Sequence, residues 1–216
     1  MRARSWRLLC VALVLIAAHA QGAKQKQAIT FAQPANQAFS PAPLTLSATA
    51  SSGLGVTFST RTKAVCTVST NAVTFVTVGN CTIRATQPGN TFYAAAANVD
   101  RTFAIAKGTQ TIAFGALADR VIGTSPFSVT ATATSGLTVS IVSLTPSTCT
   151  IANRVVRPLA LGICTLRATQ AGNANYAAAP NADRTFGVVS VSIELQYSYD
   201  AVGNVVQIRR VVAGQP

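Results

Sequence analysis

The chain has 216 residues and a formal charge of +12 at pH 7, with 10% charged and 49% hydrophobic residues. This length provides for one large or two small domains with buried cores. Its single histidine, His19, lies near the N-terminus, which excludes histidine-based catalytic triads and metal sites from the remainder of the chain.

The first twenty residues have the pattern of a secretory signal peptide. Three arginines precede an apolar run over 8–18, and Ala18-His19-Ala20 is a small-x-small cleavage pattern. The apolar run is shorter than the roughly 20 residues that a membrane-spanning helix needs. We therefore expect that residues 1–20 are removed, that no transmembrane span remains, and that the product is secreted or held at the cell envelope, outside the cell or in the periplasm.

An internal repeat dominates the rest of the chain. Residues 27–106 align with 110–189 without gaps at an offset of 83 residues, and roughly two-fifths of the aligned positions are identical. The duplication predicts two tandem domains with these bounds. The linker Ala106-Lys107-Gly108-Thr109 is short, which predicts that the domains lie nearly end to end.

Within each copy, apolar and polar residues alternate over short segments that are separated by Gly, Pro, Asn and Ser clusters. A period of two is typical of half-buried β-strands, and the clusters predict turns. We expect seven strands in the first copy, each with a counterpart 83 residues further on: 27–33, 43–50, 55–60, 64–70, 72–77, 80–87 and 98–106. This pattern predicts an all-β fold with two tandem two-sheet sandwiches.

Each copy contains two cysteines at equivalent positions, Cys66 and Cys81 in the first and Cys149 and Cys164 in the second. Strand parity puts both sulfurs of a pair on the apolar face. In an exported protein, a pair repeated at one spacing is most simply a disulfide within each domain. Zinc is the competing use of four cysteines, but no Cys-x-x-Cys pair and no histidine supports it. We expect no metal and no cofactor.

Titratable groups are few and dispersed. After residue 20 the chain has fourteen Lys and Arg and a formal charge of +9; the acids are Asp100, Asp119, Asp183, Glu194 and Asp200. Asp100 and Asp183 occupy equivalent positions, each before Arg-Thr-Phe, which favours a structural role. No carboxylates have the spacing of an acid–base pair, so we predict that the protein is not an enzyme. The dispersed basic residues predict solvated faces and no specific nucleic-acid site.

The repeated motifs resemble bacterial immunoglobulin-like modules. The likeness covers residues 27–189 and is carried by Gln-x-Ile-x-Phe, Gly-x-Cys-Thr-Ile-Arg-Ala-Thr-Gln-x-Gly-Asn and Tyr-x-Ala-Ala. Tandem modules of this kind occur in large surface and secreted bacterial proteins as spacers, stalks and adhesive surfaces. The resemblance implies Ig-like sandwiches in a structural or adhesive role and assigns no ligand. We expect envelope polysaccharide or other surface proteins as partners.

Residues 193–210 resemble the tyrosine-aspartate unit of Rhs-type proteins. The matching residues are Tyr197, Tyr199, Asp200, Gly203 and Asn204. The resemblance implies a short C-terminal β-hairpin in which both tyrosines share a strand face, Asp200 bonds the turn backbone, and Gly203-Asn204 reverses the chain. In the family, many such hairpins wind into a β-shell around a cargo.

Three hypotheses for function follow. The first is a non-enzymatic structural or adhesive spacer, because one unit is copied together with its cysteines. The second is a binding module for an anionic polysaccharide or envelope polymer, which the positive charge favours. The third is a fragment of an Rhs-type polymorphic-toxin or surface protein, which predicts further Tyr-x-Tyr-Asp units downstream in the coding sequence.

Overall fold

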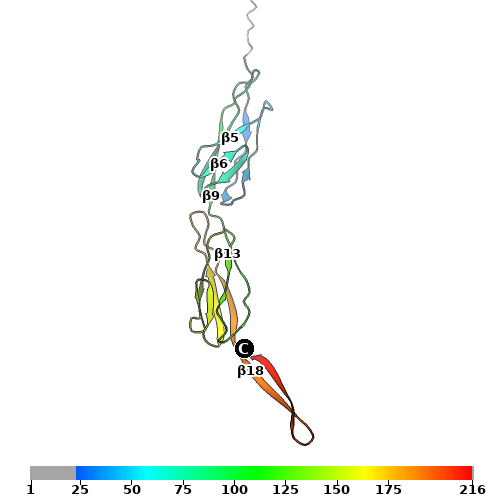
Figure 1. Cartoon of the computed structure of the whole chain (residues 1–216). Coiled ribbons are helices and arrows are strands. Elements are labelled where there is room, and N and C mark those ends of the chain that lie inside the picture. Colours follow the sequence, from blue (N-terminus) through cyan, green and yellow to red (C-terminus); the bar gives the residue numbers. More distant parts are fainter. Residues whose placement is uncertain (1–22, 216) are drawn as a thin grey trace, which may run out of the picture.

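The computed structural model describes residues 23–215, and for 192–194, 196, 206 and 209–215 it describes the backbone alone. The expected signal peptide, residues 1–20, lies outside the described residues. No helix occurs within 23–215, so none there has the length and apolar character to cross a membrane. The fold is all-β, as the sequence predicts. Two sandwiches follow one another end to end, and a C-terminal ribbon projects at an angle from the far end of the second (Figure 1).

The first sandwich contains nine short strands. They are β1 (Ile29–Phe31), β2 (Gln37–Ala38), β3 (Leu44–Thr45), β4 (Ala48–Ala50), β5 (Thr57–Thr60), β6 (Cys66–Ser69), β7 (Ala72–Phe75), β8 (Gly79–Thr86) and β9 (Val99–Ala106). One layer is the sheet β2-β9-β8-β5, and the other consists of β3-β7-β6 and the pair β1-β4. Strand β2 runs parallel to β9, whereas the other pairs are antiparallel.

The second sandwich repeats this arrangement. Its strands are β10 (Ile112–Phe114), β11 (Arg120–Val121), β12 (Phe127–Ser128), β13 (Ala131–Ala133), β14 (Ser140–Ser143), β15 (Cys149–Ala152), β16 (Val155–Pro158), β17 (Gly162–Thr169) and β18 (Ala182–Tyr199). The sheets are β11-β18-β17-β14, β12-β16-β15 and β10-β13. Each pairing therefore has its counterpart in the first sandwich.

The structure differs from the predicted strands at two places in each copy. The predicted strand 43–50 is two strands, because the chain crosses from β3 in one sheet to β4 in another. Apolar alternation continues through the crossing because both sheets face the same core, so the pattern does not mark the break. The two-residue strand β2 was not predicted, since it is short and lies among prolines.

Each sandwich has its own core with a disulfide at its centre. The bonds Cys66–Cys81 and Cys149–Cys164 join β6 to β8 and β15 to β17, with Cα–Cα separations of 5.8 and 5.7 Å, and all four cysteines are fully buried. Large apolar side chains surround each bond, led by Ile83 and Phe103 in the first core and by Leu166 and Phe186 in the second. The disulfides thus connect the two layers of each sandwich.

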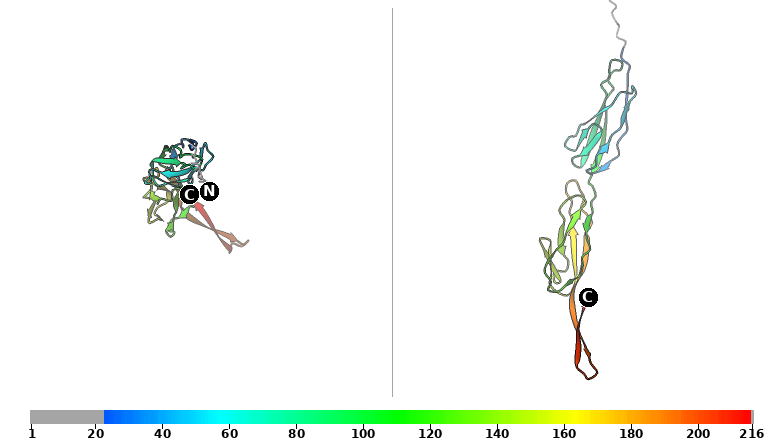
Figure 2. Two further views of the ribbon diagram at one scale, coloured as in Figure 1. Left: turned by 90° about the horizontal axis from the view of Figure 1, so that it is seen from above. Right: turned by 45° about the vertical axis from the view of Figure 1, so that its right-hand side comes forward.

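The ribbon grows directly out of the second sandwich. Strand β18 continues past the sandwich and pairs with β19 (Val205–Gln215) in an antiparallel register from Ser190 opposite Gln215 to Tyr199 opposite Val205. Seen from above, the ribbon projects outward beyond the outline of the sandwiches (Figure 2). The residues 193–210 that we predicted as a hairpin are therefore the outer part of a longer ribbon, which shares β18 with the sandwich.

Candidate functional site at the joint and the ribbon

The paired aspartates have structural partners. Asp100 accepts two hydrogen bonds of 2.7 Å from Arg84 on the adjacent strand, and Asp183 accepts bonds of 2.8 and 2.7 Å from Arg167. The hydrogen bond from Arg84 lowers the pKa of Asp100 below its ordinary value, and Arg167 lowers the pKa of Asp183 in the same way. These acids are ionised cross-strand ion-pair partners, which is not the condition of a general acid near neutral pH.

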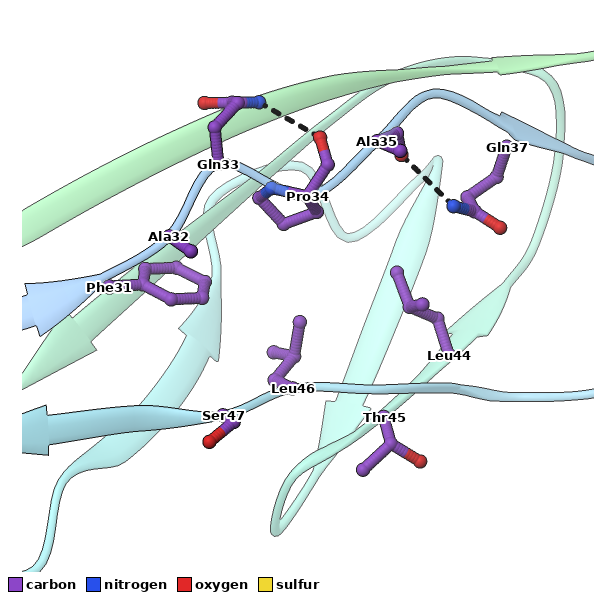
Figure 3. A pocket seen from close by; sticks show the side chains of 10 residues that line it. All are labelled: Phe31, Ala32, Gln33, Pro34, Ala35, Gln37, Leu44, Thr45, Leu46 and Ser47. Carbon is purple, nitrogen blue, oxygen red and sulfur yellow. Dashed lines mark hydrogen bonds between the residues drawn. The ribbon is translucent and has the colours of Figure 1, made fainter.

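A shallow hollow of about 340 Å³ lies beside β1, β2 and β3 (Figure 3). Its apolar side is formed by Phe31, Leu44 and Leu46, and its lining includes no ionisable side chain. The amide of Gln33 donates to the carbonyls of Pro34 and Thr102, at 3.2 and 2.6 Å. The hollow therefore offers no acid–base pair for chemistry.

Metal-binding chemistry finds no support in the part of the chain that the structure describes. No group of three or more His, Cys, Asp or Glu residues comes together there in a way that could hold an ion. Asp119, which lies apart from the other acids in sequence, accepts a hydrogen bond of 2.6 Å from the backbone N–H of Gly187. Its carboxylate thus fastens the loop before β11 to β18.

The turn of the ribbon is closed by Asp200. Its carboxylate accepts hydrogen bonds from the backbone N–H groups of Val202 and Asn204, at 3.0 and 2.8 Å, and from the side-chain amide of Asn204 at 3.0 Å. The bonds from Asn204 are the main reason that the pKa of Asp200 lies below its ordinary value. Gly203 has φ +92°, a conformation that favours glycine. These residues of the tyrosine-aspartate motif therefore close a turn.

The ribbon carries an uncovered apolar face. Leu195, Tyr197 and Tyr199 alternate along β18 and so share one face, with exposed fractions of 49, 48 and 60%. Ile208 lies opposite Tyr197 and Val205 opposite Tyr199, and both are also exposed. The two tyrosines that the sequence analysis singled out thus lie together on a surface open to solvent.

The two sandwiches meet at a joint centred on Asn175. Its side-chain oxygen accepts hydrogen bonds from the hydroxyl of Thr77 at 2.8 Å and from the backbone N–H of Val78 at 3.2 Å. Its side-chain nitrogen donates to the carbonyl of Val76 at 3.3 Å. One amide thereby binds a loop of the second sandwich to the segment between β7 and β8 of the first.

Close packing at Gly108 completes the joint. A Cβ atom at this position would lie 2.4 Å from the carbonyl oxygen of Phe39 and 3.2 Å from the ring of Tyr176, so glycine is required. The rings of Phe39 and Tyr176 pack edge to face with centroids 5.4 Å apart. Gly108 also donates to the carbonyl of Asn175 and accepts from Ala177, at 2.9 Å in each case. The linker is thus built into the contact between the sandwiches.

Buried glutamines position the loop that carries Asn175 and Tyr176. Gln110, which is 3% exposed, donates to the side chain of Gln170 at 2.8 Å and to the carbonyl of Ala177 at 2.6 Å. Gln27 makes the equivalent bonds in the first sandwich. The glutamine of the Gln-x-Ile-x-Phe motif is therefore a structural anchor for this loop.

Sequence reasoning predicted an end-to-end arrangement from the short linker but did not identify the joint. Asn175, Thr77 and Phe39 belong to segments that are far apart in sequence, and none of them has a pattern that marks a contact. A signal was present at the 83-residue offset, because Asn175 corresponds to Phe92 within the aligned copies and Gly108 corresponds to Gln25 just before them. Both exchanges fall where the second copy faces the first.

No family model matches the chain, and no curated protein matches it either. Among solved structures, it is similar to domains 1–6 of the surface-layer protein SbsC, at 17% identity and a TM-score of 0.35 over 85% of this chain and 32% of that one. It is also similar to Drosophila N-cadherin EC1-3, at 10% identity and a TM-score of 0.30 over 77% of this chain and 68% of that one. Mouse cadherin-23 EC22-24 is similar at 14% identity and a TM-score of 0.32, over 88% of this chain and 79% of that one. The chain thus spans about a third of the length of the surface-layer fragment.

Proposed function

We propose that the chain is a non-enzymatic structural or adhesive spacer that acts outside the cell or at the cell envelope. The observation that carries this proposal is the joint, where Asn175 binds the first sandwich through three hydrogen bonds and Gly108 packs against Phe39. A joint of this kind resists bending, and a protein that holds two surfaces apart needs such resistance. The buried disulfide in each sandwich supports an oxidising compartment.

The domain organisation belongs to the same proposal. We assign residues 27–106 and 110–189 to two Ig-like modules of the bacterial type, after a cleaved leader over 1–20. We assign residues 193–210 to a single tyrosine-aspartate unit of the Rhs type. The support for this last assignment is the turn in which the carboxylate of Asp200 holds the backbone of Asn204.

The spacer proposal predicts a stiff joint, which distance measurements between two spin labels can test. The labels are placed at Thr49→Cys and Thr132→Cys, which are equivalent exposed positions in the two sandwiches. We expect a narrow distance distribution in this labelled chain. Asn175→Ala removes about three hydrogen bonds, on the order of 1 kcal/mol each, and should broaden the distribution. Gly108→Ala should broaden or shift it, because the new methyl group collides with the carbonyl of Phe39.

The matched control is Gly115→Ala, since a Cβ there meets nothing within 4 Å. This variant should leave the distribution unchanged. A broad distribution before any change at the joint would contradict the spacer proposal.

A further inference from the structure

Within residues 23–215, the duplication leaves one copy of each half of the joint without a partner half, one at each end of the pair of sandwiches. Four residues of the first sandwich form one half of the joint, and their counterparts 83 positions later form a distal face at the far end of the second sandwich: Ile122, Leu159, Ala160 and Leu161. Two residues of the second sandwich form the other half, and their counterparts form a proximal face at the outer end of the first sandwich: Phe92 and Tyr93.

Both free faces have the backbone geometry of the halves that meet in the joint. At the distal face, Ile122 donates to the carbonyl of Val189 at 2.8 Å, as Phe39 donates to Ala106 at 2.8 Å. At the proximal face, the side-chain oxygen of Asn90 accepts from the backbone N–H groups of Phe92 and Tyr93 at 2.8 Å each. Asn173 accepts from the equivalent residues of the second sandwich at the same distances. Each free face is therefore preformed.

The side chains on the two free faces have changed together. In the joint, the hydroxyl of Thr77 meets the amide of Asn175. At the free ends these positions hold Ala160 and Phe92, so a polar donor and its acceptor have both been replaced by apolar groups. If only one face differed from the joint, a polar group on the other face would be left without its hydrogen-bond partner when the two faces met. The pairing of the two changes points to surfaces that meet each other.

Both free faces expose large apolar side chains. Phe92 is 73% exposed, and Leu159 and Leu161 are 47 and 57% exposed with the ribbon in place. Next to the distal face, Leu144 and Ile163 replace Arg61 and Asn80 of the first copy and are 44 and 60% exposed. An exposed apolar patch of this kind marks an interaction site. The first sandwich has the polar residues Arg61 and Asn80 where the second has Leu144 and Ile163, and it has valines where the second has Leu159 and Leu161.

We infer that the distal face of one chain docks onto the proximal face of a second copy of the same chain. The contact is head to tail, so each copy keeps a free face of each kind and the assembly can extend as a linear strand. In this contact the Phe92 ring lies against Leu159, Ala160 and Leu161. The inference goes beyond the spacer proposal, since a stiff monomer would serve as a spacer without it.

The contact between copies is wider than the joint within one chain. In the joint within one chain, the carbonyl of Phe39 lies so close to Gly108 that only glycine fits. The corresponding residue of the first copy is Gln25, so a contact that involves it needs a larger separation between the two sandwiches. The larger side chains fill the added space, because phenylalanine replaces asparagine on one face and leucines replace valines on the other. The ribbon leans away from the long axis (Figure 2), and the exposed fractions given above already include its cover.

Sedimentation and light scattering of the full chain without residues 1–20 test this inference, over concentrations up to about 1 mM. We expect the average mass to rise with concentration past that of a dimer. Phe92→Asn gives the proximal face the asparagine that Asn175 provides in the joint. Leu161→Asp places a charge in the distal face. Each should weaken association at least tenfold, because each removes a large apolar contact. Val202→Asn is the matched control, since Val202 is 83% exposed at the ribbon tip, and it should leave association unchanged.

Mixing the two defective variants separates a head-to-tail contact from a symmetric one. The Phe92→Asn chain keeps its distal face, and the Leu161→Asp chain keeps its proximal face. An equimolar mixture should therefore form a dimer that does not grow, although each variant alone is monomeric. A monomeric unmodified chain, or a mixture that stays monomeric, would overturn the inference. The spacer proposal would survive either result if the spin-label distribution remained narrow.

Discussion

At the residue scale, the cross-strand pairs link stability to pH. Asp100 and Asp183 are ionised acceptors of arginine hydrogen bonds, and their pKa values are lowered in the folded chain. A lowered folded pKa contributes stability above the ordinary value of about 4. That stability is lost as the pH falls through the folded pKa. The effect is small because the side chains of both pairs are partly exposed to solvent, by 29 to 41%.

The double variant Asp100→Asn, Asp183→Asn should therefore unfold at a lower urea concentration than the unmodified chain at pH 7. Toward pH 2 the difference between the two proteins should shrink, because the carboxylates of the unmodified chain become protonated as the pH falls through their lowered pKa values. Urea titrations at both pH values measure this difference. A gap of equal size at the two pH values would show that the ionised carboxylates are not its cause.

At the scale of elements, the ribbon depends on its turn. A two-stranded ribbon is marginally stable in water unless another group supports it. Asp200 supplies that support by accepting three hydrogen bonds within the turn, whereas strand β19 pairs with β18 alone. The sandwiches do not depend on this turn, since their cores consist of residues up to Val188.

Asp200→Ala should loosen the ribbon and leave both sandwiches intact. Hydrogen exchange should accelerate several-fold at the backbone N–H groups of Val202 and Asn204, because the carboxylate that accepts from both is lost. The same acceleration should appear in the unmodified chain as the pH falls through the lowered pKa of Asp200, since the ionised carboxylate holds the turn. After correction for intrinsic exchange rates, Val202→Ala should match the unmodified chain, because this side chain is 83% exposed.

At the scale of the whole molecule, the two cores are separate units joined through the contact at Asn175 and Gly108. The first core is built from residues between Ile29 and Ile105 and the second from residues between Phe114 and Val188. No residue belongs to both. Because each disulfide lies within one core, its loss acts on one sandwich.

The variant Cys66→Ala, Cys81→Ala should lower the stability of the first sandwich by on the order of 3 kcal/mol, the chain-entropy value for a loop of about 15 residues. Calorimetry should then show one transition at a lower temperature and the other unchanged. Cys149→Ala with Cys164→Ala is the matched variant and should move the other transition. Equal shifts of both transitions in either variant would contradict separate cores.

Much of this molecule is determined by local sequence pattern and by the internal duplication. The period of two predicts β-strands because side chains alternate across a pleated strand, and the shared parity of Cys66 and Cys81 predicts sulfurs on one apolar face. The duplication predicted two similar units, because two segments of similar sequence in one chain adopt similar folds. The motif around Asp200 indicated a turn because its bonds join residues that are near in sequence.

Contacts between distant segments required the folded chain. The crossing between β3 and β4 leaves the apolar alternation intact, and the joint unites Thr77 with Asn175 across 98 residues. No local rule relates such positions, since their contact depends on how two finished sandwiches meet. The sequence shows that the polar pair Thr77 and Asn175 corresponds to the apolar residues Ala160 and Phe92 of the other copy. Only the fold shows that Phe92 and Leu161 lie on surfaces at opposite ends of the two sandwiches.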